Sequence, residues 1–332
     1  MTKSVIDKIW ILADHRLGTY QQSIALAESF GFKYELLKVN YNYLSKLPNF
    51  LLQYFPVHLD KKSSHLIQDF ILNSNYTPKF IISSGRRTAS LALKVKKKFP
   101  NTKIIQIMQP GINYENFDFV ILPTHDKIKN KKFKNLITTT GALSRINDEL
   151  IEIEKQKFAN FFNKINKEII ILLIGGNSKG SYCDPKSIKN LCQQISTIAN
   201  NMNCFLVVFN SPRTSSQINQ ILFQNIKCDH VFYEFQNVKD NNPYIASLGW
   251  GSYFVVTGDS VSMISECCST GKPVYIFDEE KISSSKHRIF HQQFFKNNYA
   301  VLLSNTITFL KKGSFPKLQE AKRVSSLICS KF

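Results

Sequence analysis

The feature that most constrains this chain is a rhythm that repeats along its length: a short apolar run, a polar or glycine-containing turn, and a longer amphipathic segment. The apolar runs do not alternate with polar residues, which is typical of parallel strands covered by helices on both faces. The predicted strands are Lys8–Ala13, Lys79–Ser83, Thr102–Met108, Phe117–Leu122, Glu168–Ile174, Cys204–Phe209, Ser252–Thr257 and Pro273–Phe277. The predicted helices include Gln21–Phe30, Thr88–Lys98, Asp148–Ile165, Lys186–Asn201 and Ser260–Thr270. This alternation predicts an α/β fold built from βαβ units.

The rhythm restarts once, which predicts two domains. Residues 1–147 hold the first series, and a long charged helix over Asp148–Ile165 leads into a second series that opens at Ile169. A length of 332 residues agrees with two domains of ordinary size. We therefore expect two Rossmann-like, doubly wound domains facing a cleft, over residues 1–147 and 148–315. Residues 316–332 predict a C-terminal helix that packs back on the first domain.

The net charge of the chain indicates which classes of partner to expect. Lys and Arg number 43 and Asp and Glu 24, a formal net charge of +19, which favours nucleic acid, anionic lipid or phosphorylated ligands. The abundance of Lys, Asn, Ile, Phe and Tyr also has a simpler origin in an AT-rich genome, which places lysines on solvated faces. Basic clusters such as Lys94–Lys98 lack the interleaved aromatic residues of a stacking platform, so nucleic acid is not an expected partner.

The cysteines and the apolar segments predict a cytoplasmic protein. The seven cysteines include no Cys-x-x-Cys pair, which suits free thiols in a reducing compartment. The apolar run from Ile9 to Ala13 is too short for a signal-peptide core. No stretch reaches the roughly 18 apolar residues of a membrane span.

A glycine-rich turn in the second domain is a candidate anion site, because ligands of such sheets bind at the carboxyl ends of the strands. The turn runs from Gly175 to Gly180. Glycine lets backbone N–H groups approach an anion closely, and Ser178 and Lys179 add a hydroxyl and a positive charge. The alternative is a tight strand-to-helix turn without a ligand.

A second candidate anion site follows Thr257, where Ser260 is expected to begin a helix. Free N–H groups at a helix start, together with hydroxyls, suit a phosphate. Glu266, one to two turns on, is placed to accept hydrogen bonds from ribose hydroxyls. The alternatives are a plain N-cap for Ser260 and a solvated position for Glu266. Arg213, which follows another predicted strand, adds a cation.

The first domain carries candidate catalytic and cationic residues at its strand ends. Asp14 and His15 lie in the opening strand-to-helix loop, where their side chains suit a general base or an acceptor-binding site. The alternative for His15 is an ordinary surface histidine. Arg86 and Arg87 follow another strand and suit a phosphate or carboxylate, with a salt-bridged surface pair as their alternative.

Several chemistries are excluded by missing motifs. The chain has no Gly-x-Ser-x-Gly elbow and no His-Glu-x-x-His sequence. No paired Asp-x-Asp stands at a predicted strand end to hold a divalent metal. Catalysis is therefore expected to be metal-independent, without a cofactor.

One set of segments is specific as a group: Ile81–Ala89, Leu122–Asp126, Thr140–Leu143, Leu173–Lys179, Ser211–Thr214, Asn242–Tyr244, Val255–Met263 and Gly271–Val274. Taken together, these segments resemble the mitochondrial-fission family named for elongated mitochondria in plants, whose bacterial members resemble GT-B-type glycosyltransferases. The order and spacing of the matching segments hold over nearly the whole chain.

The resemblance implies roles for particular residues. In GT-B enzymes the C-terminal domain holds a nucleotide-sugar donor, and a Ser–Glu helix contacts its phosphates and ribose. In this chain that helix corresponds to Ser260, Ser262 and Glu266, with Gly175 and Gly176 nearby.

The opening loop both matches and departs from the family pattern. Relatives tend to show an Asp-Gly-Arg-Ala-Gly-His-Glu-Asn-Gln-like loop. Asp14, Arg16, Gly18 and Gln22 match it, whereas Thr19 replaces its histidine. The recruitment of a fission dynamin by plant members is not expected to carry over, because fold does not carry function.

The expected function is transfer of a sugar from a nucleoside-diphosphate sugar to a cell-envelope glycan or lipid. Asp14 or His15 would be the base. A membrane-bound acceptor would give the basic surface a use, because anionic lipids attract lysine, and would place this cytoplasmic protein at the inner membrane. The alternatives are a non-catalytic adaptor of the same fold, associated with a membrane, and a nucleotide-sugar epimerase.

Overall fold

The computed structural model describes residues 5–14, 16–52, 58–126, 133–178, 180–237 and 241–331. The chain divides into two compact units. Unit 1 comprises residues Met1–Arg145 and Gln319–Phe332, and unit 2 comprises Ile146–Leu318. Each unit is built around one six-stranded sheet, and every strand pair in both sheets is parallel.

The sheet of unit 1 has the strand order β2-β1-β3-β4-β5-β6. Its strands are β1 (Val5–Ala13), β2 (Lys33–Lys38), β3 (Thr77–Ser84), β4 (Lys103–Ile107), β5 (Phe119–Pro123) and β6 (Leu136–Thr139). Its α-helices are α1 (Leu17–Ser29), α2 (Asn49–Leu52), α3 (Lys61–Asn73), α4 (Arg86–Lys98) and α12 (Glu320–Cys329). Short 3-10 helices are η1 (Tyr43–Lys46), η2 (Tyr114–Asn116) and η3 (Thr124–Asp126).

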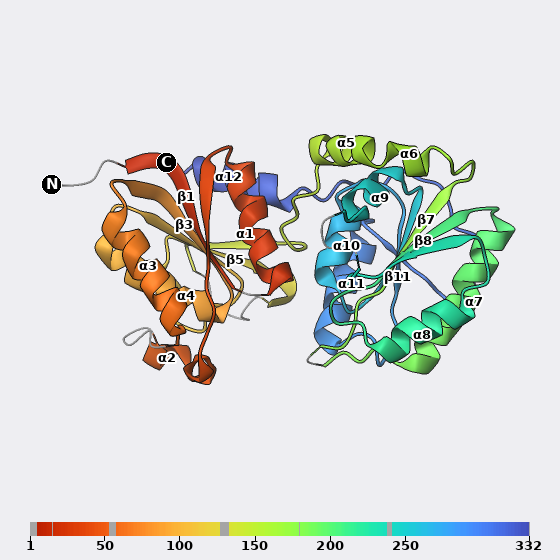
Figure 1. The fold of residues 1–332 in the computed structure, drawn as a ribbon, viewed down its shortest axis with the longest axis horizontal. Coiled ribbons are helices and arrows are strands. Elements are labelled where there is room, and N and C mark those ends of the chain that lie inside the picture. Colours follow the sequence, from red (N-terminus) through yellow and green to blue (C-terminus); the bar gives the residue numbers. More distant parts are fainter. Residues whose placement is uncertain are drawn as a thin grey trace. The chain divides into compact units, whose positions relative to one another are not determined.

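Helices cover both faces of the unit 1 sheet (Figure 1). Successive residues of β1 enter different cores: Ile9 and Ile11 pack with α1 and α12, whereas Trp10 and Leu12 pack with α3 and α4. Because side chains of a strand alternate between faces, a strand buried on both faces is apolar at most successive positions. This is the physical origin of the unbroken apolar run in the sequence.

The sheet of unit 2 has the order β12-β11-β10-β7-β8-β9. Its strands are β7 (Ile169–Leu173), β8 (Phe205–Phe209), β9 (His230–Tyr233), β10 (Tyr253–Thr257), β11 (Val274–Phe277) and β12 (Val301–Leu302). Its helices are α5 (Asp148–Lys157), α6 (Ala159–Phe162), α7 (Pro185–Asn201), α8 (Ser216–Asn225), α9 (Tyr244–Trp250), α10 (Val261–Cys268) and α11 (Ser285–Lys296). Together the two sheets confirm the predicted α/β fold with two Rossmann-like domains.

Unit 2 also has a core on each side of its sheet. Ile170 and Leu172 pack with α7 and α8, whereas Ile171 and Leu173 face the core that contains α9, α10 and α11. The helix α7 begins where the sequence places strong start signals. Asp184 Oδ2 accepts a hydrogen bond from the N–H of Ser187 at 3.0 Å, and Pro185 occupies the first turn.

The single helix predicted over Asp148–Ile165 is wrong in its length. The helix α5 ends at Lys157, and Phe158, with φ −109° and ψ 11°, separates it from the short helix α6. The C-terminal helix α12 belongs to unit 1, where Ala321, Val324 and Ile328 pack against the core that contains α1. Among the residues that the structure describes, no helix has the length and apolar character needed to cross a membrane.

The strand order of each sheet reverses at one point, and this point defines where a ligand is expected. In unit 1 the reversal lies between β1 and β3, and in unit 2 it lies between β7 and β10. Ligands of open α/β sheets bind at such a switch point, beside the carboxyl ends of the strands. The loops that follow β1, β3, β7 and β10 are therefore where we expect a ligand to bind.

Candidate functional site

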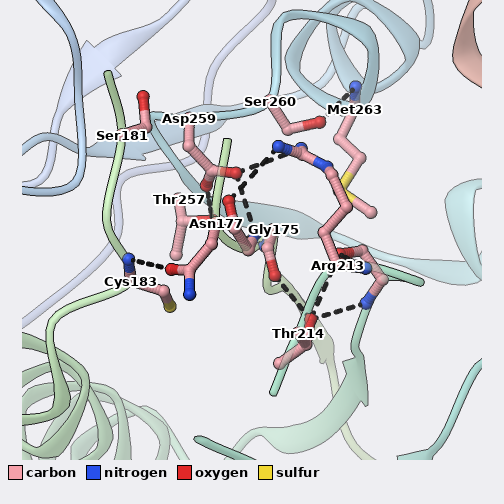
Figure 2. A network of polar contacts seen from close by, with 12 residues as sticks. Gly175, Asn177, Ser181, Cys183, Arg213, Thr214, Thr257, Asp259, Ser260 and Met263 are labelled. Atoms are coloured by element: carbon pink, nitrogen blue, oxygen red, sulfur yellow. Dashed lines mark hydrogen bonds and ion pairs between the residues drawn. The ribbon is translucent and has the colours of Figure 1, made fainter. Parts of the chain in front are cut away.

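The switch point of unit 2 brings together three loops that the sequence analysis selected separately. The segment from Ile174 to Ser178 follows β7, Ser211–Thr214 follows β8, and Gly258–Ser260 follows β10. Figure 2 shows side chains from these loops converging on the carboxylate of Asp259.

Asp259 is the hub of a buried hydrogen-bond network. Its Oδ1 accepts a hydrogen bond from Thr257 Oγ1 at 2.7 Å. Its Oδ2 accepts from the N–H of Gly176 at 2.8 Å and from an Arg213 guanidinium nitrogen at 3.2 Å. Burial raises the pKa of this carboxyl, although these three donors oppose the shift.

Both glycines of the turn are required by the close approach of protein groups. A Cβ atom on Gly175 would lie 2.1 Å from Asp259 Oδ2. A Cβ atom on Gly176 would lie 2.2 Å from the backbone carbonyl carbon and oxygen of Arg213. Real Cβ contacts are never this short, so neither position accepts a side chain without movement of its neighbours.

The amides of Gly175–Ser178, which were predicted to bind an anion, all donate to groups of the protein itself in this structure. The N–H of Gly175 donates to Thr257 Oγ1 at 2.8 Å, and that of Gly176 donates to Asp259. The N–H groups of Asn177 and Ser178 donate to backbone carbonyls, at 3.3 and 3.0 Å. The turn binds the protein's own carboxylate in place of an external anion. Lys179 lies outside the described residues.

Arg213 is the cation of this site. Its guanidinium donates to the carbonyl of Gly176 and to Asp259, each at 3.2 Å, and 39% of its side chain is exposed. The neighbouring Thr214 locks the loop beneath it, because Thr214 Oγ1 donates to the carbonyl of Gly175 at 2.5 Å. The guanidinium therefore lies at the switch point with one side toward solvent.

The start of α10 lies at the same switch point. Ser260 is the N-cap, and its side chain accepts a hydrogen bond from the N–H of Met263 at 3.5 Å. Ser262 follows in the first turn and is partly exposed. The hydroxyl of Ser260 thus has the capping role that the sequence offered as its alternative, beside any role toward a ligand.

Glu266, further along α10, is partly buried and already has a partner. Tyr244 Oη donates to Glu266 Oε2 at 2.5 Å. Burial raises the pKa of Glu266 to about 7, against the opposing effect of this hydrogen bond. Tyr244 was not predicted as a site residue, although the segment Asn242–Tyr244 is one of those that carry the family resemblance.

In unit 1, Asp14 and Arg16 form an ion pair at the switch point. Asp14 is buried, and its Oδ2 accepts from Arg16 Nε at 3.1 Å and from a terminal guanidinium nitrogen at 2.7 Å. The guanidinium lies against Gly85, the N-cap of α4, which adopts a φ of +75°. His15 lies outside the described residues.

The two arginines at the start of α4 have different surroundings. The guanidinium of Arg86 donates to the carbonyls of Ser45 and Leu47, at 2.7 and 2.6 Å, and to the side chain of Asn49 at 3.1 Å. Arg86 therefore ties a loop to α4, which is neither the anion site nor the salt-bridged pair that the sequence suggested. Arg87 lies over the ring of Tyr41, 5.3 Å from its centroid.

Gly18 and Gln22 lie one turn apart on α1. Gln22 Nε2 donates to the carbonyl of Gly18 at 3.3 Å, and Gln22 Oε1 accepts from the N–H of Leu143 at 3.4 Å. Gln22 thus connects two of the segments that carry the family resemblance. No group of three or more His, Cys, Asp or Glu side chains within the described ranges is placed to hold a metal ion.

Two Rossmann-like domains give this chain the GT-B fold class, which solved glycosyltransferase and epimerase structures share. Within this class the chain belongs to the family described as "Mitochondrial fission ELM1", whose profile matches residues 18–332.

The curated relatives agree with this assignment. The uncharacterized protein RP120 of Rickettsia prowazekii is 36% identical over 96% of this chain and 97% of its own length. The mitochondrial fission protein ELM1 of Arabidopsis thaliana is 27% identical over 60% of this chain, and the match spans about half (51%) of that plant protein.

Solved structures share the fold at low sequence identity. The UDP-GlcNAc 2-epimerase of Neisseria meningitidis, bound to UDP-GlcNAc, superimposes with a TM-score of 0.51 at 12% identity, over 97% of this chain and 91% of its own. A UDP-glucosyltransferase of Polygonum tinctorium has a TM-score of 0.53 at 10% identity, over 100% of this chain and 96% of its own. At these identities the similarity establishes the fold alone.

Proposed function

We propose that this protein binds a nucleoside-diphosphate sugar through unit 2 and transfers the sugar without a metal ion. One observation carries the proposal: a half-exposed arginine, Arg213, and the start of α10 meet at the switch point of a Rossmann-like sheet. A guanidinium beside a helix start is suited to a diphosphate, because both supply N–H donors and positive potential. Fold neighbours with UDP-GlcNAc bound give further support.

The proposal assigns roles to six of the eight residues predicted in unit 2. Arg213, Ser260 and Ser262 hold the diphosphate, and the carboxyl of Glu266 accepts hydrogen bonds from the ribose. Gly175 and Gly176 shape the turn that positions Asp259 and Arg213, and their amides do not bind the ligand.

Unit 1 holds the acceptor in this proposal, with Asp14 or His15 as the base. In the transfer step the acceptor hydroxyl loses its proton to the base and its oxygen forms a bond to the anomeric carbon. The bond from that carbon to the diphosphate breaks, and the diphosphate keeps the electron pair. The proposed acceptor is a cell-envelope glycan or a lipid at an anionic membrane, which lysine residues of this strongly basic chain attract.

A second candidate function is that of a non-catalytic adaptor with the same fold. The occupation of the glycine turn by Asp259 favours it, because the protein's own carboxylate fills a place where an anion could bind. An epimerase is the third candidate, and it would convert the donor without an acceptor.

The test is a thermal-unfolding experiment with UDP-, GDP-, ADP- and CMP-sugars, followed by product analysis. A donor at 100 times its dissociation constant should add about 2.7 kcal/mol of apparent stability. The substitution Arg213→Gln should abolish the effect. The matched control is Arg323→Gln, which removes a similarly exposed, ion-paired arginine from α12 of unit 1.

The outcomes separate the three functions. Sugar transfer that requires an acceptor supports the transferase, and donor isomerisation without an acceptor identifies an epimerase. Stabilisation by no donor, combined with retention on anionic liposomes, would refute the proposal in favour of the adaptor.

A further inference from the structure

His291 of α11 is a fully buried histidine whose two ring nitrogens both face acceptors. Nδ1 lies 2.9 Å from Asp278 Oδ2, just after β11, and Nε2 lies 2.8 Å from the carbonyl oxygen of Gly258, just after β10. The side chain is 0% exposed. The neighbouring Phe290 and Phe294 belong to the apolar core of unit 2.

Counting protons determines the charge of this imidazole. A neutral imidazole carries one N–H, so only one of its nitrogens donates. The carbonyl of Gly258 has no proton to give. Burial alone would raise the pKa of Asp278, but hydrogen bonds and nearby positive charge, including that of Arg288, lower it overall, so Asp278 is a carboxylate. Both contacts are hydrogen bonds only if His291 is an imidazolium.

The surroundings support a buried cation at this place. The Asp278 carboxylate supplies the opposite charge at hydrogen-bond distance. The charged group of α11 that also acts on Asp278 is Arg288, and its guanidinium donates to the backbone carbonyls of Ser283 and Glu280. Arg288 is therefore a second cation near Asp278, and its guanidinium has hydrogen-bond acceptors of its own.

The His291 ring packs directly on the turn that leads into α10. A Cβ atom on Gly258 would lie 2.7 Å from His291 Cε1. The N–H of Gly258 donates to the carbonyl of Phe277 at 2.9 Å, so both polar groups of this glycine are held. The next two residues are Asp259, the hub of the polar network, and Ser260, the cap of α10.

We propose that His291 is a positioning residue in its imidazolium form, which fixes the Gly258–Ser260 turn by donating to Gly258 and Asp278 at once. The charge state and the rigidity of the turn stand independently of any ligand. The consequence for ligand binding rests on the proposed function, because the turn positions Arg213, through Asp259, and the start of α10.

The charge state is tested by NMR of protein labelled with ¹⁵N-histidine. At about pH 7.5, where an imidazole in water is mostly neutral, the His291 ring should show two N–H protons. Its signals are assigned by their loss in His291→Gln. The substitution Asp278→Asn should remove the second N–H. The control His230→Gln changes a partly exposed histidine of β9 and should leave the His291 signals unchanged.

The positioning role is tested by hydrogen exchange and by UDP titration. In Asp278→Asn and His291→Gln the amide of Gly258 should exchange faster, and UDP should bind about tenfold more weakly. His230→Gln should change neither. If His291→Gln fails to fold, the wild-type spectrum still tests the charge of His291, and Asp278→Asn still tests its positioning role.

Each result has a definite reading. A His291 ring with one N–H at about pH 7.5 overturns the charge assignment. An exchange rate at Gly258 that neither variant changes overturns the positioning role. Failure of wild-type protein to bind UDP or any other nucleotide counts against the proposed function, whereas the spectrum and the exchange rates still test His291.

Discussion

The partly buried carboxyl of Glu266 should make the stability of unit 2 depend on pH. Its pKa rises from 4.5 to about 7 on folding, mainly because burial disfavours the charged form. A raised pKa means that the folded protein holds the proton more tightly than the unfolded chain. The resulting stabilisation is therefore complete below pH 4.5 and is lost as the pH rises through 7.

The substitution Glu266→Gln removes this titration and keeps an acceptor oxygen for Tyr244. One pKa unit corresponds to about 1.4 kcal/mol. The unfolding free energy of wild-type protein, relative to that of the variant, should therefore fall by about 2–3 kcal/mol between about pH 5 and pH 8. As the pH rises, Glu266 of the folded wild-type protein loses its proton and the folded state is destabilised, whereas glutamine does not ionise.

The two tryptophans of the chain allow this to be measured for one unit at a time. Trp10 is in unit 1 and Trp250 is in unit 2, so in a Trp10→Phe background the fluorescence reports unit 2 alone. Urea unfolding at several pH values then gives the free energies. The control Glu152→Gln removes a carboxyl of α5 whose side chain is 61% exposed. A free-energy difference between wild type and Glu266→Gln that is independent of pH would refute the reasoning.

Three further substitutions have expected outcomes. Gly176→Ala should lower the unfolding free energy of unit 2 by about 3 kcal/mol or more, because the added Cβ would lie 2.2 Å from backbone atoms of Arg213. Urea unfolding followed by Trp250 fluorescence should then show a midpoint at a lower urea concentration. Arg86→Met should destabilise unit 1 by about 2–4 kcal/mol, seen with Trp10, and leave nucleotide affinity unchanged in a titration. Asp259→Asn should bind UDP severalfold more tightly by calorimetry, since it removes a negative charge that competes with phosphate; weaker binding would contradict this.

The interior strands were predictable from the sequence and the edge strands were not. Each strand predicted from a continuous apolar run is present. The strands that this reasoning missed are β2, β6, β9 and β12, and these are the edge strands of the two sheets. An edge strand is less completely covered, so its residues need not all be apolar. In β2 most residues are partly or fully exposed, and both residues of β12 are exposed.

The location of the candidate site was predictable from the topology of the sheet, whereas the hydrogen bonds within the site were not. Loops after parallel strands meet at one edge of the sheet, which is why Gly175, Arg213 and Ser260 lie together. Their hydrogen-bond partners depend on contacts between distant parts of the chain. Gly176 donates to a residue 83 positions away, and His291 to a glycine 33 positions away. No local pattern in the sequence records such partners.

Asp259 links the fold of unit 2 to its proposed function. Its carboxylate neutralises Arg213 and satisfies the amide of Gly176, so this pair adds no excess of positive charge to the switch point. A diphosphate that approaches must therefore share Arg213 with Asp259 or draw the guanidinium away from it. Because the contacts of Arg213 with Asp259 and with the carbonyl of Gly176 are both at the long end of the range, 3.2 Å, the guanidinium can turn toward a ligand at a small cost. The same carboxylate would remain bound to Gly176 and Thr257 and keep the turn in place. Among the described residues, the contacts of Asp259 thus hold the turn, and Arg213 is the cation that the proposed diphosphate would meet.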